Sequence, residues 1–195
     1  MRTLSARWRI KKLRKLAKTD DVDLWAMDEV HFQQYGSRCR MWIPADLTDP
    51  VLRHHPGRKS VGYFGAVRLC DGRFVYRRES DSFNAQTCWD FLKQLERTST
   101  RRGNRVVVIA DNARYHHGKL HRDWREARGG RFALDFLPPY SPDLNPIERV
   151  WKLVRRLRLH NRYFGTLEEV ADSVENLFDQ WTRRSNTLRR LCAIT

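Results

Sequence analysis

Three acidic residues occupy positions where the presence of a carboxylate calls for an explanation. Asp28 lies inside the apolar stretch LWAMDEVHF, Asp111 directly follows the aliphatic run VVVIA, and Glu148 opens the expected helix in NPIERVWK. Carboxylates brought together repel one another and need cations, and hard oxygen ligands favour Mg²⁺ or Mn²⁺. Two such ions about 4 Å apart can activate water and stabilise the leaving oxygen of a phosphodiester. The three residues are therefore candidate catalytic residues and metal ligands.

Each of these acids also has a structural alternative. The segment from Asn145 to Glu148, with a proline at the first helical position, has the pattern of a capping box. Asp111 and Asn112 could make a turn or cap the next helix. Asp28 is harder to explain structurally, because a carboxylate within an apolar strand is costly unless it is paired, protonated or metal-bound. The combination of the three is more specific than any one of them.

The elements that would position these residues follow from hydrophobic periodicity and turn signals. Strands are predicted at residues 24–32, 60–69, 73–80, 105–110 and 131–137, with a further short strand at 40–44. Helices are predicted at residues 84–99, 119–127, 145–160 and 167–181. Asp71-Gly72, between the second and third of the long strands, is a strong hairpin signal.

This order of elements favours an α/β fold. Antiparallel strands come first and helix–strand alternation follows, which predicts a mixed five-stranded sheet flanked by helices. It also matches the ribonuclease-H-like arrangement, in which the first and fourth strands lie side by side. In that arrangement all three acids could converge on one edge of the sheet, with Asp111 held rigidly at the end of a buried strand.

The charge of the chain suggests a polyanionic partner. Lys and Arg number 38 against 23 Asp and Glu, a net charge of +15 with a pI near 10.3. Nucleic acid is the usual partner of such a protein, although a solvated basic surface is the alternative. The basic residues at the N-terminus accompany a rough apolar stripe of Leu4, Trp8, Leu13 and Leu16. This stripe predicts a lead helix that packs on the body or on DNA, and a disordered basic arm is the alternative.

Composition also bears on the compartment. No apolar run is long enough to span a membrane, and the N-terminus lacks the apolar segment of a signal peptide. The cysteines are widely spaced and form no C-x-x-C pair, so neither a zinc site nor a disulfide framework is predicted. They are Cys39, Cys70, Cys88 and Cys192. We therefore expect a cytoplasmic, nucleoid-associated protein with no membrane partner.

Three segments together resemble the DDE transposases of the mariner superfamily, in the bacterial insertion-sequence branch typified by insertion-sequence family 630. They are MDEVHF, VVVIADNARYHH and LPPYSPDLNPIERVWKLVR, which contain Asp28, Asp111 and Glu148 in turn. The resemblance covers about residues 23–181, and the proline-rich loop leading into N-P-I-E is its most specific part. The spacing between Asp111 and Glu148 is also in the family's usual range.

The resemblance implies a ribonuclease-H-like catalytic domain at residues 23–195, after a basic lead segment at residues 1–22. It implies that Asp28, Asp111 and Glu148 form the catalytic triad and bind Mg²⁺ or Mn²⁺, as two ions. The implied chemistry acts on double-stranded DNA, both the element ends and the target. Water attacks the phosphodiester at the element end, and the freed 3′-hydroxyl then attacks target DNA.

Other residues of the same motifs are candidates for orienting the catalytic groups or for contacting DNA. They are Asn112, His116, Tyr140, Asn145, Lys152, Arg155 and Arg156. Asn112 and His116 match the asparagine of the family's D-N-A motif and the histidine that commonly follows it. For His116 the alternative is a surface histidine on a polar helix.

The predicted helix at 145–160 should have a buried face and a basic face. One helical stripe should be buried, formed by Ile147, Val150, Trp151, Val154 and Leu157. Outside it should lie the basic residues Lys152, Arg155, Arg156 and Arg158. We predict that this outer face helps to hold DNA phosphates, and the alternative is a solvated basic face.

The chain departs from the family pattern at its N-terminus. Family members usually begin with helix-turn-helix modules that recognise the element ends, whereas here the first strand follows the lead segment at once. We therefore expect the catalytic half of a transposase, from a split reading frame, a truncation or a decayed copy. A separate helix-turn-helix half and self-association into a dimer stay open.

Two other functions also stay open at the level of the sequence. A domesticated or decayed DNA-binding protein would have the same charge, but it would not need to keep all three acids. A related nuclease without strand transfer would keep them, and the sequence does not separate it from a transposase.

Overall fold

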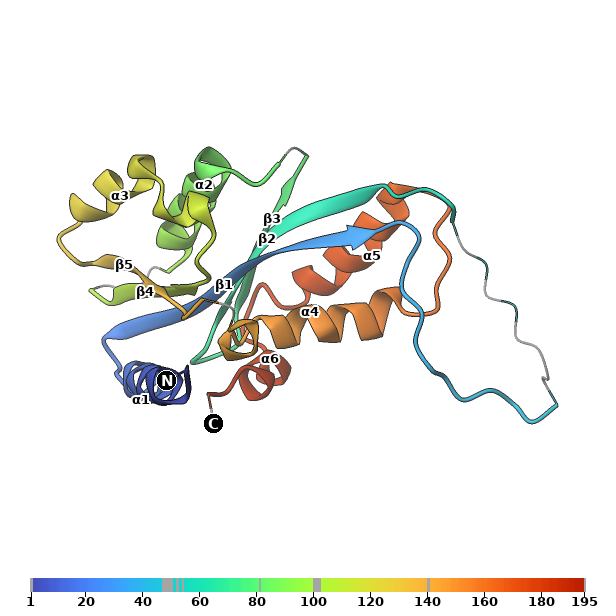
Figure 1. The fold of residues 1–195 in the computed structure, drawn as a ribbon, viewed down its shortest axis with the longest axis horizontal. Helices are drawn as coiled ribbons and strands as arrows, with labels where there is room; N and C mark the ends of the chain where they lie inside the picture. Colours follow the sequence, from blue (N-terminus) through green and yellow to red (C-terminus); the bar gives the residue numbers. More distant parts are fainter. Residues whose placement is uncertain are drawn as a thin grey trace.

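The computed structural model describes residues 2–46, 51, 53, 55–80, 82–99, 103–139 and 141–194, with the backbone alone at residues 2–7, 9 and 10. Its centre is a five-stranded sheet in the order β3-β2-β1-β4-β5 (Figure 1). The strands are β1 (Val22–Gln33), β2 (Ser60–Arg68), β3 (Phe74–Glu79), β4 (Arg105–Ala110) and β5 (Phe132–Phe136). The predicted mixed sheet of five strands is confirmed.

β1 is the central strand, and it has a different kind of neighbour on each side. It runs antiparallel to β2, where Asp28 lies opposite Gly65, and parallel to β4, where Ala26 lies opposite Ile109. The first and fourth strands therefore lie side by side, as predicted. β2 and β3 form the expected hairpin through Gly72, whose φ of 72° is rarely adopted by residues with a side chain.

Helices cover both faces of the sheet, because successive residues of a strand point to opposite sides. Trp25 and Met27 of β1 belong to one apolar cluster, and Leu24 and Ala26 belong to another. The first cluster packs under α2 (Ala85–Thr98) and α3 (Lys119–Glu126), and the second under α4 (Glu148–Val154), α5 (Leu167–Asp179) and α6 (Asn186–Leu191). Figure 1 shows α2 and α3 above the sheet and α4 and α6 below it.

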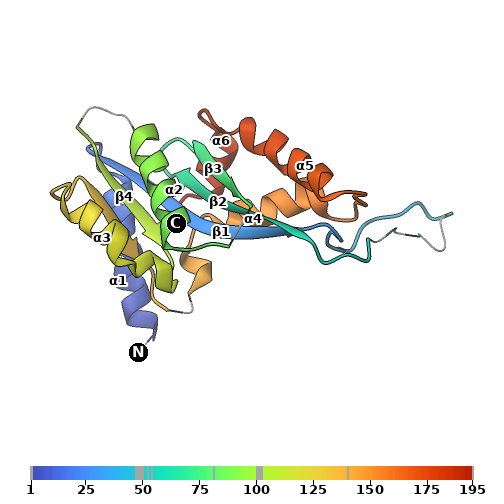
Figure 2. The ribbon, with the colours of Figure 1, turned by 90° about the horizontal axis from the view of Figure 1, so that it is seen from above.

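The basic lead segment is a helix, α1 (Arg2–Ala17), so the helical alternative is the correct one. Leu13 is buried against the body, and the ammonium group of Lys12 lies 2.5 Å from a carboxylate oxygen of Asp135. Trp8 of the predicted stripe is exposed and does not pack on the body, and packing of this residue on DNA stays a prediction. Figure 2 shows that the N-terminal end of α1 points away from the sheet.

After β1, the described residues up to 46 extend away from the body in both views (Figure 1, Figure 2). The short strand predicted at residues 40–44 is wrong, because these residues pair with no strand in the described part of the chain. The side chain of Trp42 is 100% exposed. An apolar sequence becomes a strand only where a neighbouring strand can accept its hydrogen bonds.

The helix after the proline-rich loop is interrupted, and this changes its buried face. α4 ends at Val154 and continues as a π-helical segment, η3 (Arg155–Leu159). Its wider turn rotates the residues that follow, so the prediction that Leu157 is buried is wrong. Leu157 is 41% exposed, and Leu159 occupies the core instead. The other four members of the predicted stripe are buried, as expected.

The C-terminal helix α6 was not predicted from the sequence. It is short, and its N-terminus is capped by Ser185, whose hydroxyl accepts a hydrogen bond from the backbone N–H of Leu188. Leu188 is buried in the cluster that contains α4 and α5. Six residues are too few for a periodic apolar pattern to identify a helix from sequence.

Two further predictions concern disulfide bonds and membrane-spanning helices. None of the four cysteines forms a disulfide within the described residues. Within the described ranges, no helix is long and apolar enough to cross a bilayer.

Candidate active site

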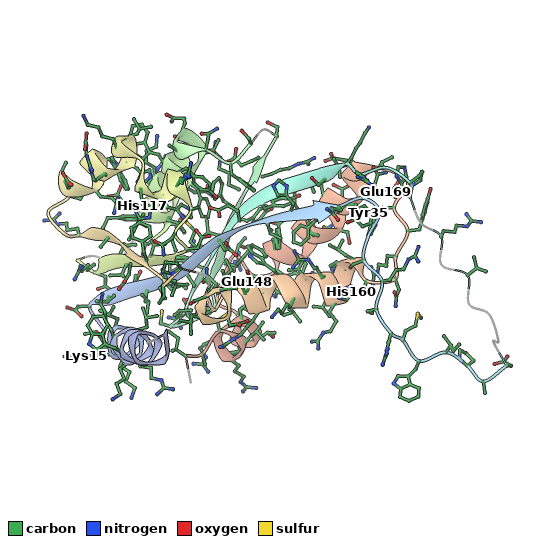
Figure 3. The ribbon with its side chains drawn as sticks, viewed as in Figure 1. Lys15, Tyr35, His117, Glu148, His160 and Glu169 are labelled. Atoms are coloured by element: carbon green, nitrogen blue, oxygen red, sulfur yellow. The ribbon has the colours of Figure 1, made fainter. Side chains whose placement is uncertain are left out.

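The three candidate acids, which are far apart in the sequence, line one cavity. Asp28 lies in β1, and Asp111 is the first residue after β4. Glu148, labelled in Figure 3, is the first residue of α4. The cavity has a volume of about 450 Å³. Its other lining residues are Asn112, Ala113, Leu137, Pro138, Pro139, Ser141, Pro142 and Asn145. The structure thus brings the three acids together, with the proline-rich loop forming part of the wall.

The register of the sheet explains why Asp28 and Asp111 meet. β1 and β4 are parallel, and their last paired residues are Ala26 and Ile109. Continuing that register by two residues sets Asp28 level with Asp111. β4 stops pairing after Ala110, so Asp111 stands at the carboxyl end of the strand, while β1 continues along β2. Two carboxylates from neighbouring parallel strands therefore face the same edge.

Asp28 is held by the helix packed beneath it. Its Oδ2 atom accepts a hydrogen bond of 3.2 Å from the indole N–H of Trp151 in α4. Burial raises the pKa of Asp28 to about 7, and the negative charges of Glu29 and Glu148 act in the same direction. The Trp151 hydrogen bond opposes this rise. Glu148 is thus close enough to Asp28 for the two carboxylates to repel each other.

Asp111 is in a different electrostatic environment. Its Oδ1 atom accepts a hydrogen bond of 3.0 Å from the backbone N–H of Ala113 and lies 2.9 Å from Nδ1 of His116. The contact with His116 is the main reason that the pKa of Asp111 is below its ordinary value, against the effect of partial burial. The turn proposed as an alternative role for Asp111 is therefore present, since the Ala113 contact closes it, and it coexists with a place in the cavity.

The capping-box alternative for Glu148 is wrong. The side chain of Asn145 does not cap α4 but donates a 2.9 Å hydrogen bond from Nδ2 to the backbone oxygen of Met27 in β1. Asn145 is buried, and among the described residues its Oδ1 atom has no hydrogen-bond partner. Glu148 is half-buried and lines the cavity. Asn145 therefore ties the proline-rich loop to the strand that carries Asp28.

His116 is not a surface histidine. It lies in a 3₁₀ turn, η1 (Arg114–His117), and its side chain is 0% exposed. Besides the contact with Asp111, its Nε2 atom lies 2.9 Å from Oε1 of Glu29. Burial acts to lower the pKa of His116, but contacts with Asp111, Cys88 and Glu29 outweigh it and raise this pKa to about 12. The ring has no exposed surface with which to contact DNA in this structure.

Glu29 is the residue of this region that sequence reasoning missed. It follows Asp28 in β1, so its side chain points to the opposite face, towards α2 and η1. The signal was available in the sequence, because a second acid in the same apolar strand carries the same cost of burial. Only the neighbouring His116, 87 residues away along the chain, gives Glu29 its partner.

The remaining candidate site residues lie in different parts of the structure. Asn112 lines the cavity, and its Nδ2 atom donates to the backbone oxygen of Leu137. Lys152 and Arg156 are exposed and line a hollow of about 290 Å³ with Arg149, Leu153 and Leu191. Arg155 and Arg158 are only partly exposed, and the Arg155 guanidinium lies 5.6 Å from the centre of the Phe32 ring. Tyr140 lies outside the described residues.

The comparisons with known proteins agree with this geometry. A sequence profile described as "DDE superfamily endonuclease" matches residues 23–171. An uncharacterized protein of Sinorhizobium fredii, y4pE/y4sA, is 49% identical over 70 residues, which are 35% of this chain and 47% of that protein. The chain thus spans about half the length of the curated relative it matches.

Solved structures with a similar fold include two of the Mos1 transposase. A mariner Mos1 paired-end complex with Mn gives a TM-score of 0.72 at 17% identity, covering 98% of this chain and 57% of that one. The isolated catalytic domain of Mos1 gives a TM-score of 0.63 at 17% identity, covering 98% of this chain and 84% of that one.

The sheet order and the helices on its faces define a ribonuclease-H-like fold, which is the fold of the Mos1 catalytic domain. Because the matched region spans more than half of the 195 residues, the chain belongs to the DDE superfamily endonuclease family.

Proposed function

We propose that this chain is the catalytic domain of a DDE transposase of the bacterial insertion-sequence branch, acting on double-stranded DNA in the nucleoid. In this proposal Asp28, Asp111 and Glu148 are the catalytic triad. The observation that carries it is the convergence of these three carboxylates on one cavity in a member of the DDE endonuclease family. The net charge of +15 suits a nucleic-acid substrate.

The cavity has the donor set of a hard divalent cation. All three acids offer oxygen, and the buried Oδ1 atom of Asn145 lacks a hydrogen-bond partner in the described part of the chain. Asp28, Asp111 and Glu148 would hold Mg²⁺ or Mn²⁺, as two ions. When bound, the metal would activate the attacking water or 3′-hydroxyl and offset the charge of the leaving oxygen.

The protein's own side chains have two other tasks. Trp151 and Asn145 keep Asp28 and the proline-rich loop in place, through the hydrogen bonds to Asp28 and to the Met27 carbonyl. Lys152 and Arg156 are exposed on α4 and η3, one helical turn apart, and follow Glu148 on the same helix. In this proposal they bind the phosphates of DNA that enters the cavity.

The proposal extends to partners. The solved Mos1 relatives include complexes with a transposon end, and by analogy the substrates of this chain are the ends of a mobile element and a target duplex. Recognition of the ends by a helix-turn-helix half, and pairing of two copies on DNA, belong to the same proposal.

The experiment compares purified parent with Asp111→Asn on supercoiled plasmid and on a duplex with a free 3′-hydroxyl end. We expect Mn²⁺-dependent nicking and joining by the parent, and loss of both in the variant. Asp172→Asn, which changes an exposed carboxylate on α5, is the matched control and should cut like the parent.

Each other outcome has a definite meaning. Nicking without joining would favour a nuclease. DNA binding without nicking, in Mg²⁺ as well as Mn²⁺, would favour a non-catalytic DNA-binding protein and contradict the proposal.

A further inference from the structure

A bridge of three side chains connects the cavity to the opposite face of the sheet. The ring of His116 lies between Asp111 and Glu29, with Nδ1 at 2.9 Å from Oδ1 of Asp111 and Nε2 at 2.9 Å from Oε1 of Glu29. The ring is 0% exposed, and the Glu29 side chain is almost fully buried. Since both ring nitrogens face carboxylate oxygens, both can donate, and the ring then carries one positive charge between two negative ones.

The bridge is poorly arranged as a separate metal site. Glu29, Asp111 and His116 offer ligand atoms that all lie within 4.8 Å of one another. However, each ring nitrogen is already at hydrogen-bond distance from a carboxylate oxygen. The lone pairs of the two imidazole nitrogens diverge, so an ion could replace only one of these contacts and would leave the other carboxylate buried without its partner.

We propose that Glu29 and His116 are positioning residues that hold Asp111 in its metal-binding orientation, an inference that rests on the proposed function. The Ala113 N–H donates a hydrogen bond to Oδ1 of Asp111. Nδ1 of His116 lies 2.9 Å from the same Oδ1 and also lies 3.2 Å from the backbone oxygen of Asp111, with which it forms a hydrogen bond. Within the described residues Oδ2 accepts no hydrogen bond, which leaves it as the oxygen available to a ligand. The Ala113 hydrogen bond and the charged contact with His116 act on one oxygen and restrict rotation of the carboxylate, while the His116 hydrogen bond to the backbone oxygen holds the residue itself.

Asp111 needs such support more than Asp28 does. Asp28 lies within a paired strand, whereas the strand pairing of β4 ends at Ala110. The Asp111 side chain is 52% exposed, so packing alone does not restrict its rotamer. Glu29 belongs to β1, which is paired on both sides. The bridge therefore transfers the rigidity of the central strand to a carboxylate at a strand end.

Glu29 has further neighbours on its own side of the sheet. Burial, and next the negative charge of Glu29, raise the pKa of the Tyr115 phenol, so the two groups interact. Cys88 of α2 is among the groups that raise the pKa of His116. These contacts belong to the layer under α2, so an anchor for a residue of the cavity lies on the side of the sheet away from α4.

The test separates the two contacts of His116. His116→Asn keeps a donor near the position of Nδ1 and loses Glu29, whereas His116→Gln keeps a donor near Nε2 and loses Asp111. Mn²⁺ affinity is measured on DNA-free protein by calorimetry, and nicking is measured as kcat and KM separately. We expect Mn²⁺ affinity to fall about 10-fold or more in His116→Gln and less in His116→Asn, with Glu29→Gln between the parent and His116→Gln.

His121→Asn is the matched control for a purely structural role. His121 is also fully buried and lies on α3, and its Nε2 atom forms a hydrogen bond with the backbone oxygen of Tyr115, while its Nδ1 atom has no hydrogen-bond partner among the described residues. Its variant should lower the unfolding midpoint while the Mn²⁺ affinity of the folded protein stays at the parent's value. The kcat of the His116 variants should fall more than KM rises, because DNA does not touch the buried ring.

The outcomes are distinguishable. Parent affinity for Mn²⁺ in His116→Gln, or an equal loss in His121→Asn, would overturn the positioning role and leave the proposed function intact. If the parent itself neither binds Mn²⁺ nor cuts DNA, the proposed function fails first. If His116→Gln does not fold, Glu29→Gln and His116→Asn still test the proposal. Unchanged Mn²⁺ affinity in both variants would refute the positioning role of Glu29 and His116.

Discussion

The indole N–H of Trp151 donates a 3.2 Å hydrogen bond to Oδ2 of Asp28, and the ring has room to do so because of a glycine. The residue opposite Asp28 on β2 is Gly65. A Cβ atom at Gly65 would lie 2.3 Å from the Cη2 atom of Trp151. The absence of a side chain on β2 therefore allows α4 to approach the sheet and hold a carboxylate of the cavity.

Gly65→Ala should therefore damage both packing and cleavage. The indole must move, so we expect a loss of roughly 1–3 kcal/mol in the free energy of unfolding, together with slower nicking. Urea unfolding and plasmid nicking measure the two effects. Gly165→Ala is the control, since a Cβ there makes only an ordinary 3.4 Å contact with Glu169. Equal behaviour of the two variants would contradict the close approach of Trp151.

Asp28 should make stability depend on pH in metal-free buffer. Its pKa in the folded protein is raised from 3.8 to about 7, so the folded state holds a proton that the unfolded state has released across that range. The contribution of Asp28 to the free energy of unfolding must then fall as pH rises through this window. Denaturant unfolding at about pH 5 and about pH 8 should show a steeper fall in the parent than in Asp28→Asn. If the free energy of unfolding depended on pH equally in both proteins, the pKa of Asp28 would not be raised in the folded state.

Divalent metal should stabilise the folded protein through the three acids. Binding to the folded state alone adds about 2.7 kcal/mol at a free metal concentration 100 times Kd. We expect Mn²⁺ to raise the thermal midpoint of the parent and to have little effect on Asp111→Asn. Because the metal needs the deprotonated form of Asp28, the stabilisation should weaken as pH falls below about 7. A shift of equal size in Asp111→Asn would place the metal elsewhere.

Lys152 and Arg156 should contribute to DNA affinity without contributing to folding. Each phosphate contact that is lost should reduce the log–log salt slope of binding by about 0.9. Lys152→Ala and Arg156→Ala are compared with Arg122→Ala, which removes an exposed charge on α3 across the sheet. Fluorescence anisotropy with a duplex at several salt concentrations gives the slopes. An unchanged slope in both α4–η3 variants would indicate a merely solvated basic face.

The π-helical segment makes a prediction about two leucines that are close in sequence. Leu159→Ala should cost about 2–5 kcal/mol of unfolding free energy, because Leu159 is in the core. Leu157→Ala should change it by no more than about 0.5 kcal/mol, because Leu157 is 41% exposed and lies outside the core. Urea unfolding of the two variants tests this directly. A larger loss of unfolding free energy for Leu157→Ala than for Leu159→Ala would indicate an uninterrupted α-helix that buries Leu157.

Local patterns were sufficient for much of the molecule. The buried run before Asp111 and the Asp71-Gly72 turn identify their strands and hairpin, because the period of two and the turn residues are properties of a few neighbouring residues. Asp28 and Asp111 stand out for a similar reason, since an acid within or just after an apolar strand has an evident cost. Glu148 stands out through the proline-rich N-P-I-E motif that contains it. The sequence alone thus determined the sheet and the candidate triad.

Tertiary structure decided what depends on distant partners. Asn145 has the local pattern of a helix cap, yet its side chain donates a hydrogen bond to the backbone carbonyl of Met27 instead. Glu29 is one more acid in a strand until the ring of His116 meets it from the opposite face. Leu157 fits the helical period, but the π-helical turn puts Leu159 in the core. In each case the lower free energy belongs to a contact between residues far apart in the chain, which no local periodicity encodes.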